Sequence, residues 1–246
     1  MKRSIFNSTL AAVIAVAGAS QGPIFAEKPR PDGEQVLNEK YHTPLSREAL
    51  LPALLDQDPS IRVAAAAKLT AQFQNDVDVI AALRSSLDRE SIHGVRIALA
   101  RDLGAMGDPR GIAILRGMCN DSKSSSLDRM VAAQTIDLLG RDDCLPEVFR
   151  VLRAPDDPQS STIALNSLYH HEQMTAVQIQ ELRELVPAFL TGMHNGVERF
   201  YAAGVLGRFG DVNSARELRE ALATELDDVA RKAMSDATSR LEKKFE

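Results

Sequence analysis

The chain has 246 residues and 44% of them are hydrophobic, which supplies enough apolar surface for a sizeable core. Aromatic residues make up only 4% and tryptophan is absent, so closely packed helices are favoured over a β-sandwich or a β-barrel. The formal net charge of −5 argues against nucleic acid as the main partner, because phosphate binding needs a basic surface.

The first 26 residues have the pattern of a secretory signal peptide. Lys2 and Arg3 form a basic start, residues 5–18 are mostly apolar, and a small residue, Ala26, follows. We therefore expect a periplasmic or secreted product, cleaved after Ala26 or, alternatively, after Ala19. The apolar stretch is short for a membrane-spanning helix, which needs about 20 residues, and no later segment could span a membrane. An uncleaved anchor and an ordinary apolar N-terminal helix are the alternatives.

A linker is expected over residues 27–45, where prolines and a glycine prevent regular structure apart from one short helical turn in EQVLNEK. Thr43 and Ser46 are the two candidates for the N-cap of the helix that follows. From there the sequence predicts a single repeat domain over residues 46–246.

An arginine recurs roughly every 33 residues inside an alanine-rich helical phrase, as in a stacked array of helical hairpins. One degenerate copy has Thr162 at the arginine position. The pattern predicts outer helices near 47–55, 76–88, 109–119, 144–153, 177–190 and 213–224. It predicts inner helices near 59–72, 91–105, 125–139, 157–170, 194–207 and 226–243.

Aspartate–proline pairs and glycines punctuate these helices. The pairs that mark turns or helix starts are Asp58-Pro59, Asp108-Pro109 and Asp157-Pro158. Glycines stand where the inner helices stop, and we expect them to form left-handed caps. They are Gly104, Gly107, Gly140, Gly207 and Gly210.

An acidic residue precedes several of the recurring arginines by six positions, and Asp156 precedes Thr162 in the same way. A guanidinium has enough donors to bond two neighbours, so we interpret the pattern as a structural ladder of ion pairs along the stack. Anion binding by the arginines is the alternative. The ladder comprises Asp56, Arg62, Glu90, Arg96, Arg129, Arg199, Glu225 and Arg231.

The two cysteines, Cys119 and Cys144, are expected to be unpaired thiols. An exported product meets an oxidising compartment, which permits a disulfide. However, they lie near the end of one outer helix and the start of the next, more than about 10 Å apart if stacked helices run in the same direction. They are also too few for a zinc site, which takes four ligands.

Two phrases, VRIALARDLGAMGDPRG at 95–111 and ERFYAAGVLGRFGDV at 198–212, resemble the HEAT-like repeats named after the phycobilisome lyases. The resemblance covers about residues 47–243. It implies an all-α fold, a right-handed α-solenoid of about six helical hairpins, whose inner helices form a concave binding face. It specifies the fold better than the function, because such repeats occur in unrelated roles.

The concave face is the candidate binding site. On repeats four and five it is expected to present Tyr169, Tyr201, Arg208 and His171, and tyrosine and arginine are favoured anchors in protein interfaces. The alternative is that Tyr169 fills the core and that the alanines on this face only favour helix formation.

Catalytic motifs are sparse. A single His171-Glu172 pair is too little for the shell of carboxylates and histidines that two irons need, so no metal or other cofactor is expected. The sequence favours an exported, non-catalytic scaffold or adaptor that binds a protein or peptide. An enzyme or an enzyme accessory subunit, either lyase-like or a metal-dependent oxidoreductase, is the alternative, and a purely structural spacer is a third interpretation.

Overall fold

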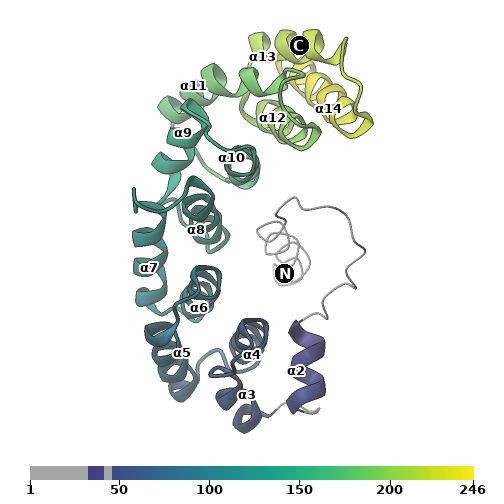
Figure 1. Cartoon of the computed structure of the whole chain (residues 1–246). Coiled ribbons are helices and arrows are strands. Elements are labelled where there is room, and N and C mark those ends of the chain that lie inside the picture. The colour runs from purple at the N-terminus through teal and green to yellow at the C-terminus, as the bar shows by residue number, and fades with distance from the viewer. Residues whose placement is uncertain (1–32, 42–45) are drawn as a thin grey trace. The chain divides into compact units, whose positions relative to one another are not determined.

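The structure is a computed structural model that describes residues 33–41 and 46–246, and these residues form thirteen α-helices and no strand (Figure 1). The chain divides into two compact units, the first ending at Asp102 and the second beginning at Leu103. The helices of the first unit are α2 (Gly33–Tyr41), α3 (Arg47–Ala53), α4 (Pro59–Gln72), α5 (Val77–Arg89) and most of α6 (His93–Ala105). Those of the second are α7 (Pro109–Cys119), α8 (Ser126–Leu138), α9 (Leu145–Arg153), α10 (Pro158–His170), α11 (Ala176–Leu185), the 3₁₀-helix η1 (Val186–Leu190), α12 (Gly196–Phe209), α13 (Val212–Leu222) and α14 (Asp228–Phe245).

In the first unit, the expected linker contains a helix. The segment EQVLNEK belongs to α2, which is longer than the single turn that we expected and packs against α3 and α4. Leu37 explains the difference, because its side chain is fully buried there and tertiary packing outweighs the weak local signal. Ser46 is the N-cap of α3 and accepts a hydrogen bond from the backbone of Ala49. The signal peptide over 1–26 and the other cap candidate, Thr43, lie outside the described residues.

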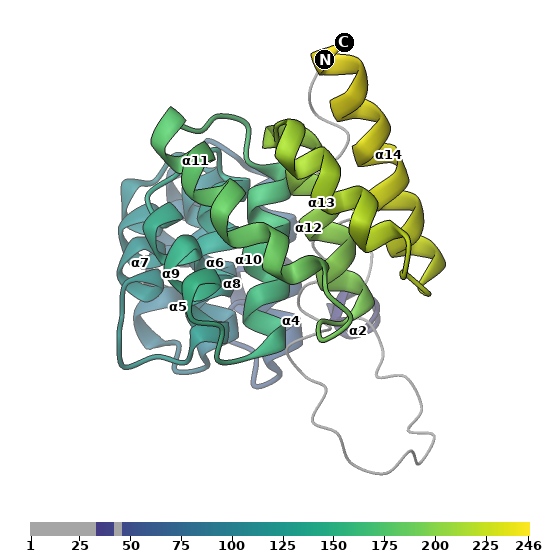
Figure 2. The ribbon, with the colours of Figure 1, turned by 90° about the horizontal axis from the view of Figure 1, so that it is seen from above.

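The second unit is a stack of helical hairpins. Its inner helices α8, α10, α12 and α14 pack against one another in chain order, and each also packs against an outer helix (Figure 1). At its C-terminal end α14 lies beside both α12 and α13 (Figure 2). Alanine at the contacts, such as the fully buried Ala202 and Ala203 of α12, lets neighbouring helices approach closely.

All twelve expected helices are present, with ends within two residues of the expected positions. One outer helix differs in kind, because the expected helix near 177–190 changes into η1 at Val186, directly before Pro187. Proline removes a backbone donor and clashes with the preceding turn of an α-helix, which accounts for the change. Asp58, Asp108 and Asp157 are N-caps that accept backbone N–H groups, each followed by proline in the first turn, as predicted.

Only two of the five glycines expected as left-handed caps have a positive φ, namely Gly107 at 80° and Gly140 at 74°. The expectation was wrong for Gly104, Gly207 and Gly210. Gly104 lies inside α6 beneath Leu139, and Gly210 ends α12 in an extended conformation. Gly207 lies inside α12, where it allows the close approach of α14.

Gly207→Ala is expected to lower the free energy of unfolding by about 1–3 kcal/mol, because overpacking forces helices apart. The added methyl carbon would lie 2.8 Å from Cβ and 3.1 Å from Cα of Ala237. Urea denaturation of the full chain measures the effect. Gly117→Ala in α7 is the matched control, since its methyl group would meet nothing within 4 Å; it should stabilise the helix by up to about 1 kcal/mol. Equal effects of the two substitutions would contradict the close approach of α12 and α14.

Cys119 and Cys144 form a disulfide, which corrects the expectation of unpaired thiols. Their Cα atoms are 6.1 Å apart, within the range that a disulfide spans. The expectation assumed outer helices that lie side by side along their whole lengths. Instead, the last residue of α7 meets the residue that precedes α9, so the end of one outer helix adjoins the start of the next. An ion pair between Arg116 and Asp143 joins the same two segments.

Candidate functional site

Aromatic side chains gather where α10 and α12 lie side by side. Tyr169 stands near the end of α10, and Phe200 and Tyr201 stand in the first half of α12. The ring of Tyr169 is 6.3 Å from that of Phe200 and 5.9 Å from that of Tyr201, and the last two rings are 5.1 Å apart. His170 adjoins Tyr169 with an edge-on contact at 4.9 Å. We call these four residues the aromatic cluster.

The aromatic cluster is open to solvent. Tyr169, Phe200 and Tyr201 are half-buried and His170 is exposed, so the rings are neither core side chains nor fully hydrated ones. Desolvation by the surrounding side chains raises the pKa of Tyr201 and lowers that of His170, part of whose ring is covered although the residue as a whole is exposed. Both rings are therefore held in their neutral forms near pH 7, and the cluster offers flat, uncharged contact area.

A glycine on α12 seats the ring of Tyr169. A Cβ atom at Gly204 would lie 2.5 Å from Cε2 and 2.6 Å from Cδ2 of Tyr169, closer than van der Waals contact permits. Tyr169 therefore leans across the backbone of α12, and this contact fixes its position beside Phe200 and Tyr201. The alternative that Tyr169 only fills the core does not fit, because its side chain is only half-buried.

Arg208 borders the aromatic cluster. Its Nη1 donates a hydrogen bond to the backbone carbonyl of Tyr169, and its guanidinium carbon lies 5.0 Å from the centre of the Phe209 ring. The hydrogen bond ties the C-terminal half of α12 to the end of α10. Among the described residues no carboxylate is shown paired with Arg208, so a positive charge stands next to neutral rings.

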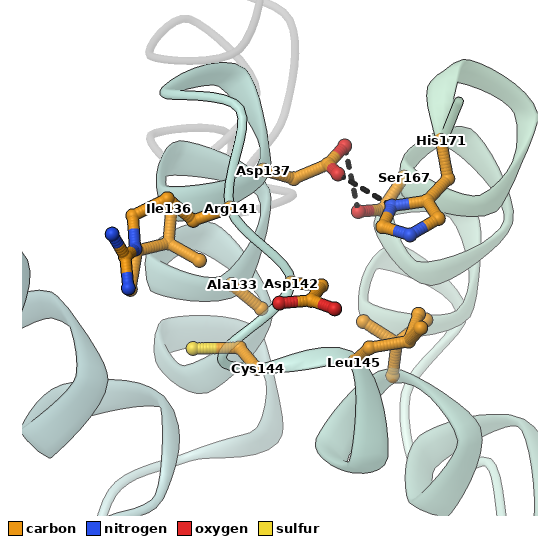
Figure 3. A pocket seen from close by; sticks show the side chains of 10 residues that line it. Ala133, Ile136, Asp137, Arg141, Asp142, Cys144, Leu145, Ser167 and His171 are labelled. Atoms are coloured by element: carbon orange, nitrogen blue, oxygen red, sulfur yellow. Dashed lines mark hydrogen bonds and ion pairs between the residues drawn. The ribbon is translucent and has the colours of Figure 1, made fainter. Parts of the chain in front are cut away.

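His171 does not join the other predicted site residues. It is buried against α8, where its Nδ1 lies 2.7 Å from Oδ1 of Asp137, and Ser167 also contacts that carboxylate (Figure 3). The hydrogen bond and charge of Asp137 raise the pKa of His171 despite burial, with a smaller contribution from Asp142. The helix ends one residue earlier, which turns the side chain away from Tyr169. The prediction that His171 shares the binding face was therefore wrong.

The His171–Asp137 pair lines a small pocket together with Asp142 and Cys144 (Figure 3). The pocket has room for about one water molecule, which is too small for an organic substrate. Within residues 33–41 and 46–246 no group of three or more histidine, cysteine or acidic residues could hold a metal ion. The pair links α10 to α8 and is best explained as a structural contact.

The stability of the chain is expected to depend on this pair below neutral pH. Because the folded pKa of His171 is raised, its stabilising contribution is fully present below the unfolded value of about 6.5 and is lost as pH rises through the folded pKa. Asp137→Asn should therefore lower the free energy of unfolding more at about pH 5.5 than at about pH 8.5. Asp121→Asn on an exposed turn is the control, with equal effects at both pH values. An Asp137→Asn effect independent of pH would exclude a charged His171.

Three of the ladder arginines, Arg62, Arg129 and Arg199, form hydrogen bonds both within their own repeat and with the next one. Nη1 of Arg62 donates to the backbone carbonyl of Asp56, and its Nε donates to Oε2 of Glu90 in the next repeat, both at 2.7 Å. Arg96 in turn donates to the backbone carbonyl of Glu90 at 3.0 Å. Glu90 thus links two arginines, one through its carboxylate and one through its backbone.

The same arrangement closes the second unit. Arg199 donates Nε and Nη2 to the carboxylate of Glu225 at 2.6 and 2.8 Å, and Arg231 donates to the backbone carbonyl of Glu225 at 2.9 and 3.0 Å. All three nitrogens of the Arg199 guanidinium donate hydrogen bonds within the fold, which favours a structural role over anion binding. Glu225 therefore accepts hydrogen bonds from Arg199 with its carboxylate and from Arg231 with its backbone carbonyl.

The ladder changes around the repeat that lacks the arginine. Arg129 donates to Glu147 on α9 at 2.6 Å, and Asp156 instead accepts a hydrogen bond from Ser126 at the same distance. On α10, Ser161 donates to Glu198 of α12. Glu147 and Glu198 were not predicted, because neither stands at the spacing of the repeat. Lys40 was also missed; it pairs with the Asp56 carboxylate from α2 at 2.5 Å.

The sequence prediction brought Tyr169, Tyr201 and Arg208 together, and the structure places these three within one surface. It did not include Phe200, His170 or Gly204. The first two are direct neighbours of the predicted tyrosines in sequence, which is the signal that could have found them. Gly204 could not be found in this way, because its role depends on a contact between two helices.

Residues 47–136 match the family model of HEAT repeats. The match supports a HEAT-like repeat protein, and the all-helical architecture is consistent with an α-solenoid. No curated protein and no solved structure matches the chain. HEAT repeats commonly serve as protein-interaction scaffolds and are typically non-catalytic. None of the helices in the described part of the chain is long and apolar enough to cross a membrane.

Proposed function

We propose that the chain is an exported, non-catalytic scaffold that binds a protein or peptide on the surface formed by the aromatic cluster and Arg208. The half-exposed rings of Tyr169 and Tyr201 beside an arginine carry this proposal. Such side chains give large contact area at a low cost in conformational entropy, and they dominate the binding energy of many interfaces. The HEAT-like repeats support it, since their inner helices form extended binding surfaces in other proteins.

Two observations support export to the periplasm or the medium. The first 26 residues have the composition of a signal peptide, and the Cys119–Cys144 disulfide belongs to the kind that persists in oxidising compartments. N-terminal sequencing of the protein purified from its native cells tests the proposal. A mature chain that begins at Glu27, or at Ser20 for the alternative cleavage, is expected. An uncleaved chain recovered with reduced thiols from the cytoplasm would refute export.

The phycobilisome-lyase type of repeat is part of the same proposal. Its support is the phrase at residues 198–212, which forms most of α12 and lies outside the range matched by the HEAT family.

The absence of catalysis is tested by metal analysis of the mature chain. A folded, metal-free protein agrees with a scaffold, whereas stoichiometric iron or zinc would favour the enzyme alternative.

Capture from the native envelope tests the binding surface. We expect tagged wild-type chain to retain one dominant protein after crosslinking, and the double variant Tyr201→Ala/Arg208→Ala to lose it. Arg216→Ala on the outer helix α13 is the matched control, since its side chain is 63% exposed and lies on another face. Capture that is unchanged in the double variant would show that the binding site lies elsewhere.

A further inference from the structure

Two arginines occupy equivalent positions on neighbouring inner helices. Arg208 stands nine residues after Arg199 on α12, and Arg240 stands nine residues after Arg231 on α14. The two helices pack side by side and are close together near this level, where Gly207 faces Ala237. Arg240 therefore extends the surface of the aromatic cluster from α12 onto α14.

Neither guanidinium is shown with a carboxylate partner among the described residues. Arg208 donates one hydrogen bond to the backbone carbonyl of Tyr169. Arg240 is exposed and has no hydrogen bond or ion pair to a described side chain. Acids are near in sequence but are already engaged. Asp236, one turn before Arg240, pairs with Lys232 at 2.6 Å, and Glu242 pairs with Arg219.

This arrangement differs from the ladder on the same two helices. There Arg199 has both carboxylate oxygens of Glu225, and Arg231 has a backbone carbonyl and Asp228. In a chain with a net charge of −5, most arginines can find an acid within the fold. Arg208 and Arg240 keep donors available, and Arg208 lies directly beside rings of the aromatic cluster.

We propose that the partner segment is an acidic peptide, with an Asp or Glu carboxylate that binds Arg208 and Arg240 and an adjacent apolar side chain that packs on Tyr169 and Tyr201. This inference rests on the proposed function and specifies the chemistry of its ligand. Arginine binds a carboxylate through two parallel N–H donors, which gives direction as well as energy. The rings exclude water from one side of that contact and strengthen it.

A displayed library of random twelve-residue peptides, selected on the full mature chain, tests the inference. Peptides enriched on the wild-type chain are expected to contain Asp or Glu next to an aromatic or aliphatic residue. For the best binder, replacing its acid by the corresponding amide should weaken binding by at least about tenfold, as for loss of a charged hydrogen bond. Calorimetry measures the affinity.

Matching variants of the chain complete the test. Arg240→Gln should also weaken binding about tenfold, and since its side chain makes no described contact the fold should be unaffected. Arg208→Gln should act in the same direction, and Arg216→Gln on α13 should leave the affinity unchanged. The amide peptide should bind the wild type and Arg240→Gln with about equal affinity. It lacks the carboxylate that contacts Arg240, so the substitution of Arg240 has no further interaction to remove.

The outcomes separate the two proposals. The first outcome is that the peptides bind the Tyr201→Ala variant more weakly than the wild type, while the acidic peptide and its amide form bind the wild type equally well. That result would refute the acidic ligand and leave the binding surface supported. If no peptide is enriched, or enriched peptides bind Tyr201→Ala as tightly as wild type, both proposals fail.

Discussion

Glu225→Gln is expected to lower the free energy of unfolding by about 3 kcal/mol, because it removes one partner of a buried ion pair. The side chain of Glu225 is 3% exposed and that of Arg199 is 13% exposed, so water replaces little of the lost interaction. Glu225 also accepts the backbone N–H groups of Leu226 and Asp227 before α14. Urea denaturation at pH 7 measures the loss.

The effect of Glu225→Gln has a predicted pH dependence and a control. Arg199 lowers the pKa of Glu225, so the stabilisation is present above the unfolded value of about 4.3 and is lost as pH falls through the folded pKa. The variant and the wild type should therefore converge in acid. Glu220→Gln on α13, whose 3.9 Å pair with Arg216 is exposed, should cost less than about 1 kcal/mol. Equal losses at both positions would contradict the role of the ladder.

Removal of the disulfide with Cys119→Ser/Cys144→Ser is expected to destabilise the chain by about 2–4 kcal/mol. The bond closes a loop with a sequence separation of 25 residues, which contains α8, and it therefore restricts the unfolded chain. Both cysteines are buried, at 0% and 2% exposure, so serine also introduces polar atoms into the core.

The redox dependence of the wild type supplies the control for the cysteine variant. A strong thiol reductant should lower the free energy of unfolding of the wild type by nearly as much as the double substitution does. The free energy of unfolding of the double variant should not change with the reductant. If the wild type is equally stable in both conditions, the disulfide does not contribute to folding stability. A single variant, Cys144→Ser, would leave Cys119 as a reactive thiol and is less informative.

The helices could be predicted because their signals are local. Asp58, Asp108 and Asp157 each stand directly before proline, and alanine-rich phrases repeat at a nearly constant interval. These signals act within one helix and do not depend on what packs against it. By contrast, α2 has no strong local signal, and it forms because Leu37 is buried in the first unit.

Contacts between repeats were harder to predict. The disulfide depends on how α7 and α9 follow one another, which no single repeat specifies. The position of His171 also depends on a contact between repeats. Its place nine residues after Thr162 suggested the inner face, but the helix ends at His170 and the side chain contacts Asp137 of α8. The candidate surface was found because Tyr201 and Arg208 lie seven residues, or about two helical turns, apart on the same face of one helix.

The central claim is that a partner binds at the aromatic cluster, and site-specific photocrosslinking in native cells tests it most directly. A photoreactive phenylalanine analogue replaces Tyr201 in one chain and Val177 of α11 in another; Val177 is 77% exposed on an outer helix and serves as the control. We predict a discrete crosslinked protein from position 201 and none from position 177. Crosslinks of equal yield from both positions, or from position 177 alone, would contradict binding at the inner-helix surface.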